Sequence, residues 1–191
     1  MLAKHYNVEK SIAGRIVRFI DSKPNLTSDC EKEIEIFEKE NGIELHASQK
    51  DAVTAAVNNG LVVITGGPGT GKTTIVKCIL NVFKNMKLRV ALCAPTGRAA
   101  KRMTEATGVE AKTIHRLLDI EVDGDENFTY EEYKKLPIDA VIVDEVSMVD
   151  EYVFNSLVKS LSQGTRLVLV GDRDQLPSVG AGNVLYDVIK S

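Results

Sequence analysis

A glycine-rich stretch with one lysine and two threonines stands between an apolar run and a helical pattern. Residues 66–74 read Gly-Gly-Pro-Gly-Thr-Gly-Lys-Thr-Thr, which fits the phosphate-binding pattern G-x-x-x-x-G-K-[ST]. Glycines let backbone N–H groups approach phosphate oxygens, and the positive end of the next helix faces the anion. We expect ATP here, with Lys72 meeting the β- and γ-phosphates and Thr73 binding Mg2+. The other expected nucleotide contacts in this loop are Gly67, Pro68, Gly69, Thr70, Gly71 and Thr74. A glycine-rich turn with a chance lysine is the alternative.

Two adjacent carboxylates end a second apolar run. Asp144 and Glu145 follow Val141-Ile142-Val143, and parallel α/β sheets bind ligands at the carboxyl ends of their strands. Asp144 is placed to hold Mg2+, directly or through water. Glu145 is placed to orient and deprotonate an attacking water. A surface loop that merely begins with two acids is the alternative.

A third apolar run, 167–171, is followed by Asp172-Arg173-Asp174-Gln175. The amide of Gln175 carries both a donor and an acceptor, so it could bond a γ-phosphate and report whether that group is still attached. We count Gln175 with Lys72, Asp144 and Glu145 as the catalytic set. A polar turn residue is the alternative for Gln175.

Four apolar runs predict the strands that would position these groups, at 61–65, 88–93, 140–144 and 167–171. Helical patterns alternate with them, which predicts an α/β fold with a parallel sheet and helices on both faces. A short helical segment, residues 1–44, precedes this core and is expected to be a linker or the end of an upstream domain. Within it, the spacing of Ile12, Ile16 and Ile20 predicts one helix face. Ser28 and Glu31 predict a capping box for a second helix that runs toward Asn41-Gly42.

The net charge and the cysteines limit which partners and which compartment we expect for the chain. The 191 residues carry a formal net charge of −3, so nucleic acid would have to bind a local basic patch. Three cysteines without metal-type spacing indicate reduced thiols and a cytoplasmic protein, and no stretch could span a membrane. Residues 119–135 are acidic and are expected to form a surface excursion.

Three further stretches are more specific than the phosphate loop. They read Ala-Pro-Thr-Gly-Arg-Ala-Ala at 94–100, Thr-Ile-His-Arg-Leu-Leu at 113–118 and Gly-Asp-Arg-Asp-Gln-Leu-Pro-Ser-Val-Gly at 171–180. Together with 66–74 and 143–148, they make residues 43–190 resemble the first motor domain of a superfamily 1 DNA helicase. The RecD branch, which includes the exodeoxyribonuclease V alpha subunit, is the most similar.

This resemblance implies a RecA-like P-loop NTPase fold, DNA-stimulated ATP hydrolysis and 5′-to-3′ movement along single-stranded DNA in recombination and repair. It implies that Gln49 reads adenine, although an ordinary helix-start residue is the alternative. It also implies DNA contacts at Pro95, Thr96, Arg98, Lys101, Arg102, His115 and Arg116. A solvated basic helix face is the alternative for part of this set, and a structural histidine is the alternative for His115.

The resemblance also predicts partners. Residues 45–191 would be motor domain 1, and a second RecA-like domain, absent from this chain, would complete the nucleotide cleft. We therefore expect the isolated chain to be largely inactive. Other recombination or nuclease subunits are further possible partners. A P-loop ATPase that acts as a nucleotide-dependent switch or remodeller, without translocation, stays open as an alternative.

Overall fold

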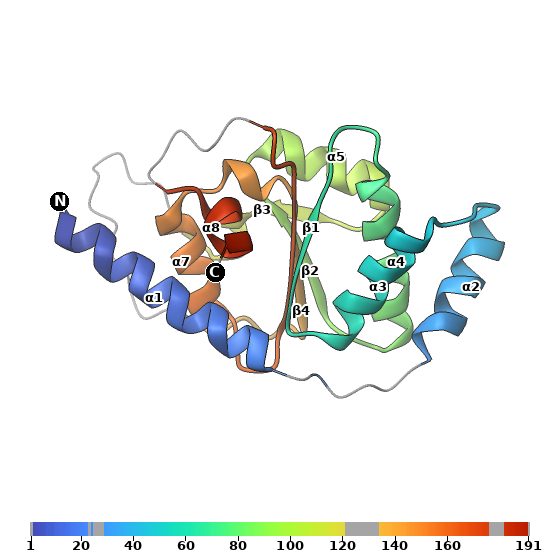
Figure 1. Cartoon of the computed structure of the whole chain (residues 1–191), viewed down its shortest axis with the longest axis horizontal. Coiled ribbons are helices and arrows are strands. Elements are labelled where there is room, and N and C mark those ends of the chain that lie inside the picture. Colours follow the sequence, from blue (N-terminus) through green and yellow to red (C-terminus); the bar gives the residue numbers. More distant parts are fainter. Residues whose placement is uncertain (1, 23, 25–28, 121–133, 176–181, 191) are drawn as a thin grey trace.

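A parallel sheet forms the centre of the molecule (Figure 1). The computed structural model describes residues 2–22, 24, 29–120, 134–175 and 182–190. Within them the strand order is β1-β5-β4-β2-β3, and every neighbouring pair is parallel. The strands are β1 (Leu61–Thr65), β2 (Val90–Ala94), β3 (Ala111–Thr113), β4 (Ala140–Val143) and β5 (Arg166–Gly171). All their carboxyl ends therefore meet at one edge.

Helices cover both faces of this sheet, as predicted. On one face pack α2 (Cys30–Asn41), α3 (Ala47–Asn58), α4 (Lys72–Asn85) and α5 (Gly97–Thr107). On the other pack α1 (Leu2–Asp21), α6 (Ile114–Leu117), α7 (Glu151–Ser160) and α8 (Val184–Lys190). Side chains alternate along each strand, so Ile142 joins the first core while Val141 and Val143 join the second.

The N-terminal helix α1 packs on α7 and on β1. Ile16 and Phe19 are buried, and Ile12 packs against the same core. Ile20 is 57% exposed, so the predicted three-residue face is wrong at this position. Each four-residue step overshoots one helical turn by about 40°, and two such steps carry Ile20 off the buried face.

Helix α2 begins one residue later than a cap at Ser28 would place it. Asp29 is its N-cap and accepts from the Lys32 N–H, while Ser28 lies outside the described residues. The predicted end is confirmed, because Gly42 adopts φ 62° and donates to the Glu38 carbonyl. Ile34 and Phe37 bury the inner side of this charged helix against the sheet core.

Other element boundaries also differ from the prediction. Strand β2 starts at Val90 rather than at 88, because Lys87 takes φ 58° and the Leu88 N–H closes a turn on Phe83. The edge strand β3 was not predicted. The final helix, α8, starts at Val184. Most of the predicted acidic excursion, residues 121–133, lies outside the described part. Of the helices described, none is long and apolar enough to cross a membrane.

Candidate nucleotide and DNA site

The phosphate loop joins the end of β1 to the start of α4 at Lys72. Two glycines make this tight path possible, since Gly69 has φ 77° and Gly71 has φ 83°. The Thr70 hydroxyl donates to the Gly67 carbonyl across 2.9 Å. The Lys72 ammonium donates to the carbonyls of Gly66 and Gly67, so it lies over the loop itself.

The backbone of this loop is accessible at two glycines, as phosphate binding requires. A Cβ built at Gly67 or Gly69 would meet no protein atom within 4 Å, so the backbone there is open to an approaching ligand. The first N–H groups and the positive end of the 14-residue helix α4 face the same space. Anionic oxygens are the ligands that such a helix start prefers.

The donor set near the loop also fits Mg2+. Thr73 offers a hydroxyl and Asp144 a carboxylate, and Mg2+ prefers oxygen ligands. No group of three or more His, Cys, Asp or Glu that could hold a metal occurs among the residues described. A Mg2+ ion would thus take its remaining ligands from phosphate and water, as is usual for nucleotide sites.

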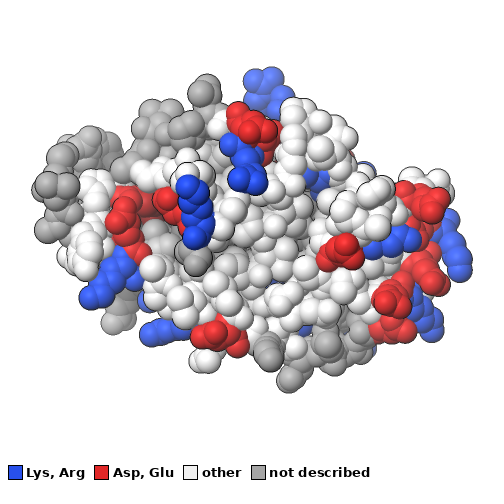
Figure 2. All heavy atoms as spheres, in the orientation of Figure 1, with Lys and Arg blue, Asp and Glu red and all other residues white. Residues whose placement is uncertain are grey.

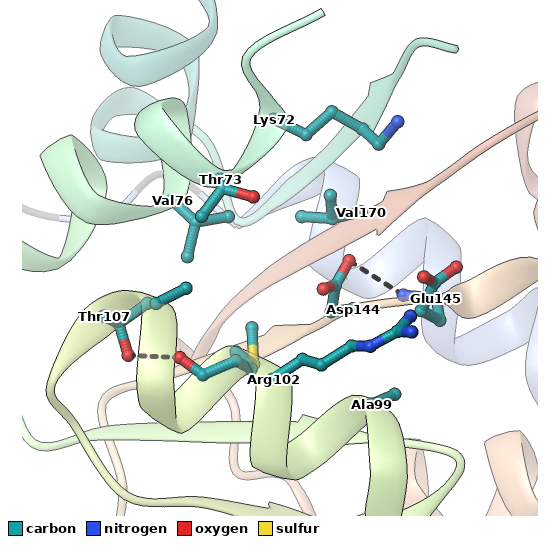
Figure 3. Close-up of a pocket in the computed structure, with 11 residues that line it drawn as sticks. Lys72, Thr73, Val76, Ala99, Arg102, Thr107, Asp144, Glu145 and Val170 are labelled. Carbon is teal, nitrogen blue, oxygen red and sulfur yellow. Dashed lines mark hydrogen bonds between the residues drawn. The ribbon is translucent and has the colours of Figure 1, made fainter. Parts of the chain in front are cut away.

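The carboxylates Asp144 and Glu145 follow β4, the central strand of the sheet. Glu145 adopts φ 54°, a left-handed conformation that costs a non-glycine residue about 1 kcal/mol or more. Its N–H donates to Asp144 Oδ1 across 2.9 Å. This sharp turn makes the two adjacent side chains face one cavity (Figure 3).

Burial sets the electrostatics of both carboxylates. It raises the pKa of Asp144, against the Glu145 N–H and the charge of Lys72. Burial also raises the pKa of Glu145, and the neighbouring Asp144 adds to this rise. Lys72, a hydrogen bond with Gln175 and the charge of Arg102 act in the opposite direction on Glu145. The predicted catalytic groups are therefore electrically coupled to one another.

A cavity of about 230 Å³ lies between α4, α5 and the carboxyl ends of β4 and β5. Figure 3 shows Lys72 and Thr73 on one side of it, with Asp144 and Glu145 across from them. Its lining consists of Lys72, Thr73, Val76, Ala99, Arg102, Met103, Ala106, Thr107, Asp144, Glu145 and Val170. The structure thus brings together four of the residues expected to act on nucleotide or metal.

Gln175 lies beside this cavity rather than in its lining. It follows β5, the neighbour of β4, and its side-chain amide acts to lower the pKa of Glu145. Its Oε1 accepts a hydrogen bond from the Ser147 hydroxyl across 3.3 Å. Sequence reasoning gave Ser147 no role, although it belongs to the quoted stretch 143–148. Residues 176–180 of the stretch that follows Gln175 lie outside the described residues.

Gln49 lies directly against the phosphate loop. His46 is the N-cap of α3, and its N–H donates to Gln49 Oε1 across 2.9 Å. The other end of the same amide donates from Nε2 to the Thr70 carbonyl across 3.2 Å. His46 thus caps the start of α3, and the Gln49 side chain points toward the phosphate loop.

The residues expected to contact DNA follow β2 and the neighbouring strand β3. Thr96 caps α5 by accepting from the Ala99 N–H across 3.2 Å. Arg98 and Arg116 are exposed, and His115 is half-buried. Pro95 is half-buried at the end of β2, and the exposed Lys101 lies 3.9 Å from Glu105.

Arg102 departs from the rest of this set, because it lines the cavity beside Asp144 and Glu145. Figure 2 shows acidic and basic side chains interspersed over the face viewed, without a broad field of one sign.

Comparison with known proteins agrees with this arrangement. The family described as AAA domain matches residues 49–181. The "ATP-dependent RecD2 DNA helicase" of Deinococcus radiodurans is 44% identical over 138 residues, which cover 72% of this chain and 19% of that protein. The "RecBCD enzyme subunit RecD" of Mycolicibacterium smegmatis is 41% identical over 165 residues, covering 74% and 30%. This chain therefore spans less than a third of the length of these two relatives.

The crystal structure of Pif1 helicase from Candida albicans has a similar fold. It superposes with a TM-score of 0.55 at 25% identity, covering 72% of this chain and 34% of that one. Together with the parallel sheet, this confirms the predicted RecA-like P-loop fold. The chain belongs to the AAA domain family and is homologous to RecD-like superfamily 1 DNA helicases.

Proposed function

We propose that this chain is the nucleotide-binding motor domain of an ATP-dependent DNA helicase that moves along single-stranded DNA. The observation that carries the proposal is the shared cavity of Lys72, Thr73, Asp144 and Glu145 at the carboxyl edge of the sheet. The residues expected to meet DNA leave the same edge, from β2 and β3. One relative is named a DNA helicase and another a RecD subunit, and their matches cover 72% and 74% of this chain.

In this proposal each residue of the site has a separate task. The loop backbone and the start of α4 bind the phosphates, and Lys72 moves from the loop carbonyls to a β- or γ-phosphate oxygen. Thr73 and Asp144 would hold Mg2+, which when bound neutralises charge on the phosphate oxygens. Glu145 orients the attacking water and accepts its proton.

Gln175 completes the site by connecting the γ-phosphate position to its surroundings. Its amide acts on the pKa of Glu145 and accepts a hydrogen bond from Ser147, so loss of a phosphate contact would affect both residues. Gln49 would contact adenine while it stays anchored on the loop through Thr70. Gln49 belongs to α3, Glu145 and Ser147 follow β4, and Gln175 follows β5, so hydrolysis could change the relative positions of several elements.

The proposal extends to partners. A second RecA-like domain would close over the cavity and supply an arginine, a group worth about 10³–10⁵ in rate in related phosphoryl transfer. Because some relatives are named subunits of a RecBCD enzyme, other recombination or nuclease subunits are candidate partners. The cytoplasm is the proposed compartment, since DNA is the proposed track.

Two measurements test the proposal: nucleotide binding, and the dependence of ATP hydrolysis on DNA. Calorimetry should show Mg2+-dependent binding of a slowly hydrolysed ATP analogue, and Lys72→Ala should weaken it. The longest natural protein that contains this chain should hydrolyse ATP faster when a single-stranded oligonucleotide is added, and should displace a strand. Hydrolysis without strand displacement or movement would instead support a nucleotide-dependent switch. Absence of nucleotide binding in the chain and in the longer protein would refute the proposal.

A further inference from the structure

One basic residue of α5 is turned away from its neighbours and toward the hydrolytic carboxylates. Arg102 lines the same cavity as Asp144 and Glu145, and Figure 3 shows its side chain extending from α5 toward Glu145. Ala99, Met103 and Ala106 line the same cavity, as expected for positions three and four apart on one helix side. Arg98 and Lys101 do not line it.

The guanidinium of Arg102 is close enough to act on Glu145 without being fixed by it. Its positive charge acts on the Glu145 carboxylate, yet Arg102 forms no ion pair with any residue in the described part of the chain. The residue is exposed overall, so part of it stays accessible from outside. The Lys72 ammonium, by contrast, is held by two loop carbonyls.

The position of α5 gives this guanidinium a second possible partner. The helix starts directly after β2, at the edge where DNA is proposed to pass, and Thr96 caps its first turn. A guanidinium has five donors in a planar fork, which suits carboxylate and phosphate oxygens equally. A phosphate of DNA on α5 and the carboxylate of Glu145 would therefore compete for one side chain.

We propose that Arg102 is a positioning residue that couples DNA contact at α5 to the hydrolytic carboxylate Glu145. The guanidinium turns toward Glu145 when no phosphate is near α5 and turns toward the phosphate when DNA is bound. The attraction of the guanidinium on Glu145 is then removed, which leaves this carboxylate to orient water beside the nucleotide. This inference rests on the proposed function and adds the residue through which the two sites would communicate.

Arg102 lines the proposed nucleotide cavity, so its movement toward DNA would change the charge that a bound nucleotide meets. Coupling between two binding sites is reciprocal, so this change is measurable by binding as well as by hydrolysis. In the longest natural protein that contains this chain, the affinity for a fluorescent single-stranded oligonucleotide is measured with and without a slowly hydrolysed ATP analogue and Mg2+. The ratio of these two affinities is the coupling. We expect about a fivefold ratio or more in the wild type, the usual lower range for coupled sites.

Three variants separate coupling from simple DNA binding. Arg102→Ala should bring the ratio of the two DNA affinities close to one. It should also reduce the stimulation of ATP hydrolysis by DNA. Arg98→Ala, on the same helix but outside the cavity, should lower DNA affinity and leave the ratio unchanged. Arg102→Lys should restore DNA affinity and part of the ratio, because it keeps the charge and loses the planar fork.

The outcomes distinguish this inference from the proposed function. A folded Arg102→Ala protein that keeps the wild-type ratio would overturn the role of Arg102 while leaving the motor proposal intact. An equal loss of the ratio in Arg98→Ala would also overturn it, because the effect would then belong to any basic residue of α5. A wild-type protein that binds neither nucleotide nor DNA would overturn the proposed function itself.

Discussion

The side-chain amide of Gln49 donates to the Thr70 carbonyl oxygen across 3.2 Å, which ties the first turn of α3 to the phosphate loop. The same amide accepts from the His46 N–H across 2.9 Å and so closes the capping box of that helix. One side chain therefore stabilises a helix start and holds the loop that is proposed to bind phosphates.

Replacing Gln49 by alanine should weaken nucleotide binding and reduce any preference for ATP over GTP. A net hydrogen bond contributes about 0.5–1.5 kcal/mol, so the expected loss of affinity is about two- to tenfold. Titration with fluorescent nucleotides measures both effects. Ser48→Ala is the matched control, because Ser48 lies in the same turn and its side chain contacts His46 rather than the phosphate loop. Equal affinities and equal base preference in both variants would contradict this role for Gln49.

Two glycines of the phosphate loop should respond differently to alanine. At Gly71 the φ of 83° is strained for alanine, and the new Cβ would lie 2.3 Å from Gln49 Nε2. Gly71→Ala should therefore lower both the melting temperature and nucleotide affinity. At Gly67 the Cβ would meet no protein atom within 4 Å, so Gly67→Ala should keep the melting temperature.

The same Gly67→Ala protein should nevertheless bind nucleotide poorly, because its methyl group would occupy space proposed for a phosphate. Thermal unfolding and nucleotide titration on the two variants separate folding from binding. If Gly67→Ala binds ATP as the wild type does, this side of the loop is not where the phosphates lie.

The packing of α1 against the sheet can be tested by alanine substitutions at two other glycines, Gly60 and Gly14. A Cβ at Gly60 would lie 2.2 Å from the Phe19 carbonyl oxygen and 2.9 Å from Ser22 Cβ, so Gly60→Ala must displace the end of α1. We expect a loss of about 1–3 kcal/mol in the free energy of unfolding. Gly14→Ala, within α1 and with nothing nearby, should instead add about 0.5–1 kcal/mol.

Urea unfolding followed by circular dichroism measures both changes. Wild-type stability in Gly60→Ala would show that the end of α1 does not rest on the start of β1. A destabilising Gly14→Ala would show that this position is not an ordinary exposed helix interior.

Acid should weaken the contact that joins the starts of β2 and β4. The Arg89 guanidinium and its backbone N–H donate to Asp139 at 2.8–2.9 Å and lower the pKa of that carboxyl from 3.8 to about 2. A lowered folded-state pKa means that the stabilisation is complete above pH about 4 and is lost as the pH falls toward about 2.

The wild type should therefore exceed Asp139→Asn in stability by about 1 kcal/mol at pH 7, since the pair is partly exposed. This difference should shrink below pH about 4. Chemical unfolding over a pH series measures it. Glu105→Gln is a control, because Glu105 lies 3.9 Å from Lys101 in an exposed pair and should change little. A difference independent of pH would contradict the assignment.

The sequence predicted what depends on strong local patterns. The runs that became β4 and β5 are buried on both faces, as central parallel strands are, whereas β1 is a continuous apolar run at one end of the described sheet. All three match their predicted ranges within a residue. Strand β3 was missed because Ala111-Lys112-Thr113 is short, polar and at the sheet edge. Its formation depends on pairing with β2, which no local pattern records.

In the candidate site, too, features set by local patterns could be predicted, and features set by tertiary packing could not. The convergence of Lys72 and Asp144 followed from the rule that parallel strands end at one edge. The direction of Arg102 could not be predicted, because it depends on how α5 is rotated against the cavity. The link between Ser147 and Gln175 was also out of reach, since it joins loops that follow two different strands.

The most direct test of the central claim is the rate of ATP hydrolysis by wild-type and Glu145→Gln protein, with and without single-stranded DNA. The longest natural protein that contains this chain should show a DNA-stimulated rate. Glu145→Gln should lower that rate about 10²–10⁴-fold while nucleotide affinity is retained, because only the base is removed. Hydrolysis at the wild-type rate in Glu145→Gln would contradict the assignment of this cavity as the hydrolytic site.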